Sequence, residues 1–267
     1  MLGLVDTHCH LDAAEFEDDR GAIAQAAWEA GVSAIVVPAV ERNNSHAVQA
    51  LCRTTPGCVP AYGIHPMYVA HAAQTDLAAL EGLLAEDDCV AVGEIGLDFF
   101  IQDYDRELQE WFFVEQLKLA RQYDLPVLLH IRRAQDAILK HLRQIRVRGG
   151  IAHAFNGSRQ QAEEFIKLGF KLGFGGAMTW PRALRIRELA ATLPLETIVL
   201  ETDAPDMPPE WLGHGQRNSP QQLPRIAQIL AEIRGEKVCE IVDATARNVI
   251  EALPKLPQLF TPPHVLL

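Results

Sequence analysis

Cysteine is scarce in this sequence, and its arrangement excludes two common roles. Five cysteines are spread over 267 residues, and no two of them form a Cys-x-x-Cys pair. The odd number argues against a disulfide framework, and the spacing argues against a zinc knuckle. We therefore expect a protein of a reducing compartment.

Long apolar runs and an excess of positive charge are also missing. No apolar stretch reaches the roughly 18 residues that a membrane-spanning helix needs, and no signal-peptide pattern opens the chain. Lys and Arg number 24 against 35 Asp and Glu, so the net charge is −11. Such a surface repels polyanions as a whole, although it leaves room for a local basic rim. We expect a cytoplasmic protein with no membrane contact and no stable protein partner.

What the sequence does contain is an alternation of short apolar runs with helical patterns. The apolar runs are centred near residues 4, 36, 62, 92, 128, 152, 172 and 200, at spacings of about 20 to 36. This rhythm is typical of βα units around a parallel sheet, and eight strands is the number that closes a barrel. We therefore predict an α/β fold, a single-domain (β/α)8 TIM barrel over residues 1–252. The Pro-rich tail at 253–267 is expected to pack on its exterior.

An open doubly wound sheet is the alternative architecture. Such a sheet usually carries a glycine-rich phosphate-binding turn after its first strand. Here His8 and His10 stand at that position instead. Side chains two apart on a strand point to the same side, so the two imidazoles are expected to face one way.

Polar residues also end most of the other apolar runs. His65, Glu94, His130, His153 and Asp203 follow the third, fourth, fifth, sixth and eighth runs. In a TIM barrel the active site lies at the carboxyl ends of the strands. Burying any one of these residues is costly unless it is paired or bound to a metal, and a single histidine there is often only structural. Their shared position favours a functional site.

The donor set points to metal ions. Neutral imidazoles with carboxylates and no thiolates suit zinc, manganese, iron or nickel, and leave magnesium less natural. The donors exceed what one tetrahedral centre with an open position uses, whereas two ions about 3.5–4 Å apart, bridged by a carboxylate and a water, would use them all. We predict two divalent metal ions (Zn, Mn or Mg).

Seven motifs stand at or near the strand ends. They are Thr7-His8-Cys9-His10-Leu11, Gly63-Ile64-His65-Pro66, Gly93-Glu94-Ile95-Gly96-Leu97-Asp98, Pro126-Val127-Leu128-Leu129-His130-Ile131-Arg132, His153-Ala154-Phe155-Asn156-Gly157, Glu201-Thr202-Asp203-Ala204-Pro205 and Arg217-Asn218-Ser219-Pro220. Together they resemble the TatD-type family of metal-dependent hydrolases, within the amidohydrolase-like barrels. The resemblance implies that six residues bind metal, with Glu94 shared between two ions: His8, His10, Glu94, His130, His153 and Asp203. It also implies hydrolysis of a phosphodiester, since deoxyribonuclease is the family's best-described activity.

Three residues depart from the pattern of that family. Met67 stands where some members have a second histidine, Phe99 where many have tyrosine, and Asn156 where serine is usual. None of the three is an expected metal ligand. They leave the hydrolase prediction intact and bear on the identity of the substrate.

The expected reaction uses a metal-activated water, with Asp203 and Glu94 as catalytic residues. Asp203 would orient the water or accept its proton. His65 and Arg132 are candidates to bind phosphate oxygens, and the alternative for Arg132 is to face solvent. Glu201 would support a ligand imidazole or serve as a buried structural carboxylate. Three further residues lie in loops that would reach the substrate: Asp98, Asn156 and Arg217.

Two enzyme functions compete. The first is a deoxyribonuclease acting on single-stranded DNA or strand ends, because nothing suggests the broad basic cleft that grips a duplex. The second is a small-molecule amidohydrolase or esterase using the same binuclear centre. Such barrels often place a carboxylated lysine after strand four, where this chain has Glu94. A third possibility, a catalytically silent interaction module, predicts missing ligands, and no expected ligand is missing.

Overall fold

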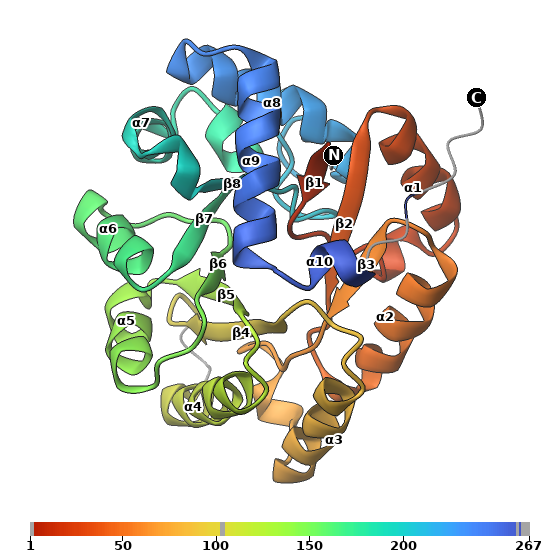
Figure 1. The fold of residues 1–267 in the computed structure, drawn as a ribbon, viewed down its shortest axis with the longest axis vertical. Helices are drawn as coiled ribbons and strands as arrows, with labels where there is room; N and C mark the ends of the chain where they lie inside the picture. Colours follow the sequence, from red (N-terminus) through yellow and green to blue (C-terminus); the bar gives the residue numbers. More distant parts are fainter. Residues whose placement is uncertain (1–2, 102–104, 260–261, 263–267) are drawn as a thin grey trace.

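The computed structural model describes residues 3–101, 105–259 and 262. These residues form eight strands, arranged as a ring with helices outside it (Figure 1). The strands are β1 (Leu4–Asp6), β2 (Val32–Pro38), β3 (Cys58–Ala61), β4 (Val92–Asp98), β5 (Val127–Arg132), β6 (Gly150–Ala152), β7 (Phe170–Phe174) and β8 (Ile198–Leu200).

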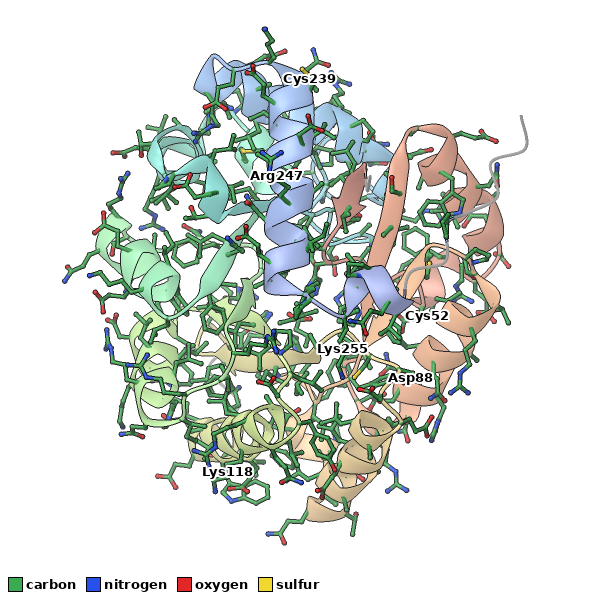
Figure 2. The ribbon with its side chains drawn as sticks, viewed as in Figure 1. Cys52, Asp88, Lys118, Cys239, Arg247 and Lys255 are labelled. Carbon is green, nitrogen blue, oxygen red and sulfur yellow. The ribbon has the colours of Figure 1, made fainter. Side chains whose placement is uncertain are left out.

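Helices follow the strands in the alternation that the sequence predicts. They are α1 (Arg20–Glu29), α2 (Arg42–Thr54), α3 (Gln74–Ala85), α4 (Arg106–Gln122), α5 (Gln135–Gln144), α6 (Arg159–Lys167), α7 (Leu184–Thr192), α8 (Leu223–Arg234), α9 (Val238–Ala252) and α10 (Leu256–Leu259). Their outer faces carry charged side chains such as Lys118 on α4, which points away from the barrel (Figure 2). Within the described ranges no helix has the length and apolar character needed to cross a membrane.

All neighbouring strands run parallel, in two runs of continuous pairing. β1, β2 and β3 pair in that order, and β4 to β8 pair in sequence order. Backbone hydrogen bonds bridge the two remaining junctions. The N–H of Gly93 donates to the carbonyl of Tyr62 (2.9 Å) between β3 and β4, and the N–H of Thr7 donates to the carbonyl of Leu200 (3.1 Å) between β8 and β1. The ring is closed, and the prediction of a TIM barrel is confirmed.

The amino ends of the strands are covered by the last helices. Leu253 and Leu256 are fully buried in one apolar cluster with residues of the barrel interior, including Val36 and Leu128. Figure 1 shows α9 and α10 lying across the centre of the ring. Lys255 bonds to Asp87, in the connection between α3 and β4 (Figure 2 labels Lys255). The start of the tail therefore packs over this opening, whereas residues 260, 261 and 263–267 lie outside the described residues.

One local prediction was wrong. The fourth strand lies further along the chain than the apolar run suggests, so Glu94 lies within β4 rather than at its end. Glycine permits this extension, since a Cβ on Gly96 would lie 2.0 Å from the carbonyl oxygen of His130 on β5.

A buried carboxylate ties the first strand to the last. Asp6, fully buried, accepts hydrogen bonds from the hydroxyl (2.6 Å) and the N–H (2.9 Å) of Thr202 and from the N–H of His8 (3.3 Å). Burial raises the pKa of Asp6 to about 7, although these hydrogen bonds act to lower it. Because His8 follows Asp6 closely and Asp203 follows Thr202, the Asp6–Thr202 contact fixes site residues that follow β1 and site residues that follow β8.

We expect Thr202→Val to lower the free energy of unfolding by about 2 kcal/mol, because it leaves a buried carboxyl oxygen without its donor. Urea unfolding of the metal-free protein would measure it. The matched control is Thr245→Val in α9, whose hydroxyl donates to the Ile241 carbonyl (2.8 Å). Because the Ile241 carbonyl also belongs to a helix, we expect Thr245→Val to lower the free energy of unfolding by less than Thr202→Val does. Equal losses in the two variants would contradict a special role for the Asp6–Thr202 contact.

Candidate metal centre

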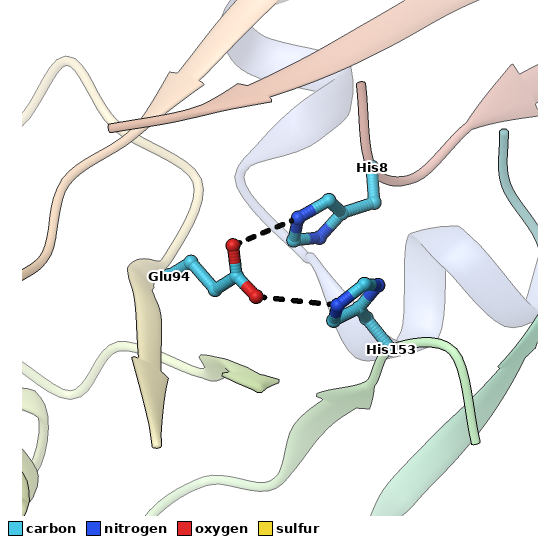
Figure 3. A group of neighbouring side chains, drawn as sticks. All are labelled: His8, Glu94 and His153. Atoms are coloured by element: carbon cyan, nitrogen blue, oxygen red, sulfur yellow. Dashed lines mark hydrogen bonds and ion pairs between the residues drawn. The ribbon is translucent and has the colours of Figure 1, made fainter. Parts of the chain in front are cut away.

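One buried carboxylate lies at the centre of the candidate site. Glu94 is 2% exposed, and both of its oxygens face imidazole nitrogens at the carboxyl ends of the strands. Oε2 lies 3.1 Å from His8 Nε2 and 3.5 Å from His10 Nε2. Figure 3 shows Glu94 between His8 and His153, whose rings stack with centroids 3.9 Å apart. The first strand thus supplies the donors on one side of the carboxylate.

The other oxygen of Glu94 faces a second set of donors. Oε1 lies 3.0 Å from His130 Nδ1, 3.2 Å from His153 Nε2 and 3.5 Å from His65 Nε2. His130 lies within β5, which continues to Arg132 beyond the predicted strand end, whereas His153 and His65 follow β6 and β3. One carboxylate is therefore shared by two groups of imidazoles.

Asp203 completes the first group. Its Oδ1 lies 3.8 Å from His8 Nε2 and 3.7 Å from His10 Nε2. Its backbone N–H donates to the carbonyl of His8 (2.8 Å) and it has a φ of 58°, a left-handed conformation that aspartate tolerates better than most residues. Each of three residue sets brings its donor atoms within 4.8 Å of one another: His8–Glu94–His153, His8–His10–Asp203 and His65–Glu94–His130.

In the metal-free protein, protons balance the charge of the carboxylates. Burial opposes a charge on His10, but the hydrogen bond and attraction to Glu94, with Asp203, raise the pKa of His10 to about 9. Burial likewise opposes the charge on His153, and Asp203 and Glu94 outweigh it to raise its pKa. Burial also acts to raise the pKa of Glu94, but the surrounding imidazoles hold it well below its usual range. Protonated imidazoles therefore neutralise the buried carboxylates, and divalent cations can take the place of these protons.

The donor chemistry fits such cations. The nearby atoms are nitrogens and oxygens without a thiolate, and the ring of His130 is oriented for coordination. Its Nε2 faces Asp98 Oδ2 at 3.2 Å, which places the ring proton there and leaves Nδ1 to face the centre. Glu201, 1% exposed, lies 3.7 Å from the outer nitrogen of His153. Glycine makes room for it, since a Cβ on Gly173 would lie 2.1 Å from Glu201 Oε2.

The structure brings together all six residues predicted as ligands, and His65, predicted to bind phosphate, lies beside them. Arg132 lies at the rim, 48% exposed, with Nη1 3.8 Å from Asp98 Oδ2. Arg217 is not in the site, because its guanidinium binds the Asp19 carboxylate at 2.6 and 2.9 Å. Asn156 accepts from Arg185 (2.8 Å).

The expectation that Asp98 lies in a substrate-facing loop was wrong. Asp98 is the last residue of β4, 1% exposed, and supports His130. Alternation along the strand was the signal for this role, since residues 94 and 98 share a parity and therefore a side.

Comparisons with known proteins agree with this geometry. A family model described as TatD related DNase matches residues 5–254. An uncharacterised metal-dependent hydrolase of Escherichia coli (strain K12), YjjV, is 45% identical over 247 residues, covering 91% of this chain and 95% of that protein. A crystal structure of YjjV covers 94% of this chain and 98% of its own, with a TM-score of 0.91. The 3'-5' ssDNA/RNA exonuclease TatD of the same organism is 32% identical over 92% of this chain and 97% of its own.

We expect metal binding to release protons. The pKa of His10 is about 9 in the metal-free protein, so Zn²⁺ added at pH 7 should displace at least about one proton per chain. The apparent affinity for Zn²⁺ should then rise with pH up to about 9. Titration calorimetry in buffers of different ionisation enthalpy would count the protons. His46→Asn, on the exposed face of α2, is the control and should change nothing. An affinity that is flat from pH 6.5 to pH 9 would contradict the expectation.

Proposed function

The chain belongs to the TatD-related DNase family, and from this premise we propose that this metal-dependent hydrolase cleaves phosphodiester bonds in single-stranded DNA or at DNA ends. The observation that carries the proposal is the position of Glu94, whose two oxygens face separate donor groups. That arrangement suits a two-metal hydrolytic centre better than a single structural ion. A relative at 32% identity is named a 3'-5' ssDNA/RNA exonuclease, which supports the substrate class.

Each donor group would hold one ion. His8, His10 and Asp203 would hold the first, His130 and His153 the second, and Glu94 would be shared between them. When bound, such ions supply an activated water and neutralise charge on the phosphoryl oxygens. Zinc, manganese and magnesium are the candidate metals.

Asp203 is the group placed to handle the proton of the attacking water. Among the carboxylates nearest the imidazoles, Glu94, Asp98 and Glu201 are each at most 2% exposed, whereas Asp203 is 15% exposed. A buried carboxylate has no route for passing a proton to solvent, and an accessible one does. Asp203 would orient the water and take its proton, while Glu94 acts through its fixed charge.

His65 is better suited to bind substrate than to bind metal. The N–H of Met67 donates to His65 Nδ1 (3.1 Å), so a neutral ring must carry its proton on Nε2, the atom that faces the centre. Burial holds the pKa of His65 well below its usual range, and the positive charges of neighbouring imidazoles add to this effect. The ring therefore presents an N–H donor, which suits a phosphoryl oxygen.

Arg132 would hold the phosphate from the rim. Its guanidinium is partly exposed, and the one carboxylate that the described residues place within 4.0 Å is Asp98, at 3.8 Å. A planar guanidinium can bind phosphate through two hydrogen bonds.

We also infer a cytoplasmic location, supported by the five cysteines, all of which are free thiols.

We expect Asp203→Asn to slow the cleavage of end-labelled single-stranded DNA by at least about 100-fold, because the proton acceptor is lost. The protein would be stripped with chelator and restored separately with Zn²⁺, Mn²⁺ or Mg²⁺. Asp206→Asn, an exposed change three residues along the same loop, is the matched control and should stay near the parent rate.

The same preparations would be assayed on a panel of amides and carboxylic esters. Cleavage of those compounds without any phosphodiester cleavage would favour the small-molecule amidohydrolase over the nuclease. A fast Asp203→Asn protein would refute the assigned role of Asp203.

We expect His65→Ala to lower kcat/KM on DNA by about 100-fold with unchanged metal content, because a donor to the phosphoryl oxygen is removed and no ligand is lost. His65→Gln, whose amide N–H can take the place of Nε2–H, should recover part of the rate. Elemental analysis gives the metal content. Loss of one ion per chain in His65→Ala would show that His65 is a ligand instead.

A further inference from the structure

A large aromatic side chain is exposed beside the candidate centre. Phe100 follows β4, and its side chain is 43% exposed. Two arginines from the end of β5 cover it: the guanidinium carbon of Arg132 lies 3.9 Å from the ring centroid and that of Arg133 lies 4.6 Å from it. We call Phe100, Arg132 and Arg133 the Phe100 platform.

The platform is fixed relative to the centre by backbone contacts. The N–H of Phe100 donates to Asp98 Oδ1 (2.9 Å), and the other oxygen of Asp98 faces His130. The N–H of Phe99 donates to the carbonyl of Arg132 (2.8 Å). The aspartate that orients a proposed metal ligand therefore also holds the backbone of Phe100.

Arg133 forms no ion pair within the described part of the chain. Some exposed arginines lie on carboxylates, as Arg53 does on Asp88 (3.0 Å) and Arg143 on Glu164 (2.7 Å). Among the described residues, no carboxylate lies within the 4.0 Å limit of an ion pair with the exposed Arg133. The Phe100 ring restricts the guanidinium without neutralising it, which lowers the entropy lost when an anion binds.

We propose that Arg133, supported by Phe100, binds the phosphate next to the scissile one in a single-stranded polynucleotide. The proposal rests on the proposed function, in which Arg132 binds the scissile phosphate. Since both guanidinium groups pack on one ring, Arg133 lies close to Arg132 at the rim of the centre. A chain leaving the centre over the platform would place its next phosphate there, and the site would prefer substrates with more than one phosphate.

The test measures binding without turnover. Fluorescence anisotropy of a labelled single-stranded oligodeoxynucleotide, in EDTA and over a range of salt concentrations, would compare variants. Arg133→Asn suits the φ of 54° at this position, and Arg146→Asn removes the same charge from a loop at the opposite end of the barrel. Arg133→Asn should weaken binding about fivefold to tenfold and reduce the slope of log K against log salt by about 0.7. Phe100→Leu should weaken binding about twofold to fivefold.

A small phosphodiester separates this proposal from the proposed function. Bis(p-nitrophenyl) phosphate has a single phosphate, so the Mn²⁺-loaded Arg133→Asn protein should cleave it at the parent rate while losing activity on the oligonucleotide. If Arg133→Asn and Arg146→Asn bind the oligonucleotide equally, or the parent does not bind it, the platform proposal is wrong. If binding depends on Arg133 but no phosphodiester is cleaved, the proposed function fails and the binding site stands.

Discussion

The arrangement of the site depends on burying the charge of Glu94. A lone carboxylate at 2% exposure would be strongly destabilising, and here five imidazoles surround it at 3.0–3.5 Å. Without metal, the raised pKa values of His10, His130 and His153 keep protons available to balance that charge. Cations can replace those protons at the same nitrogen and oxygen atoms. The groups that share protons around Glu94 are therefore the ones that would hold metal.

This clustering requires the first and last strands to be neighbours. His8 and His10 follow β1, and Asp203 follows β8, so an open sheet that separated these strands would divide the donor set. The Asp6–Thr202 contact joins the strands just below the site, and Asp203 donates to the backbone of His8. On the opposite side, Gly96 lets β4 approach β5 closely enough for Glu94 to meet His130. The contacts that close the barrel are therefore also the contacts that bring the donor residues together.

The sequence predicts the barrel and the six donors because both depend on local patterns. Apolar runs mark the strands, and a polar residue at the end of a buried run is costly enough to mark a site. The hydrogen-bond partners of the other site residues depend on distances in the folded chain, which no sequence pattern encodes. Whether His65 donates or coordinates depends on the N–H of Met67, and Arg217 was misjudged because its partner Asp19 lies far away in the sequence. Strand ends were misplaced where glycine continued β4 past its apolar run.

The charge distribution limits how this protein can meet a polyanion. A net charge of −11 repels nucleic acid at long range, but salt screens that field over about 8–10 Å. Attraction must then come from direct contacts at the mouth of the barrel, where Arg132 and Arg133 pack on Phe100. A duplex would bring two phosphate backbones close to an acidic surface, whereas a single strand brings one. Under the proposed function, local cations on an acidic barrel would therefore favour a single-stranded substrate, recognised by contact rather than by long-range steering.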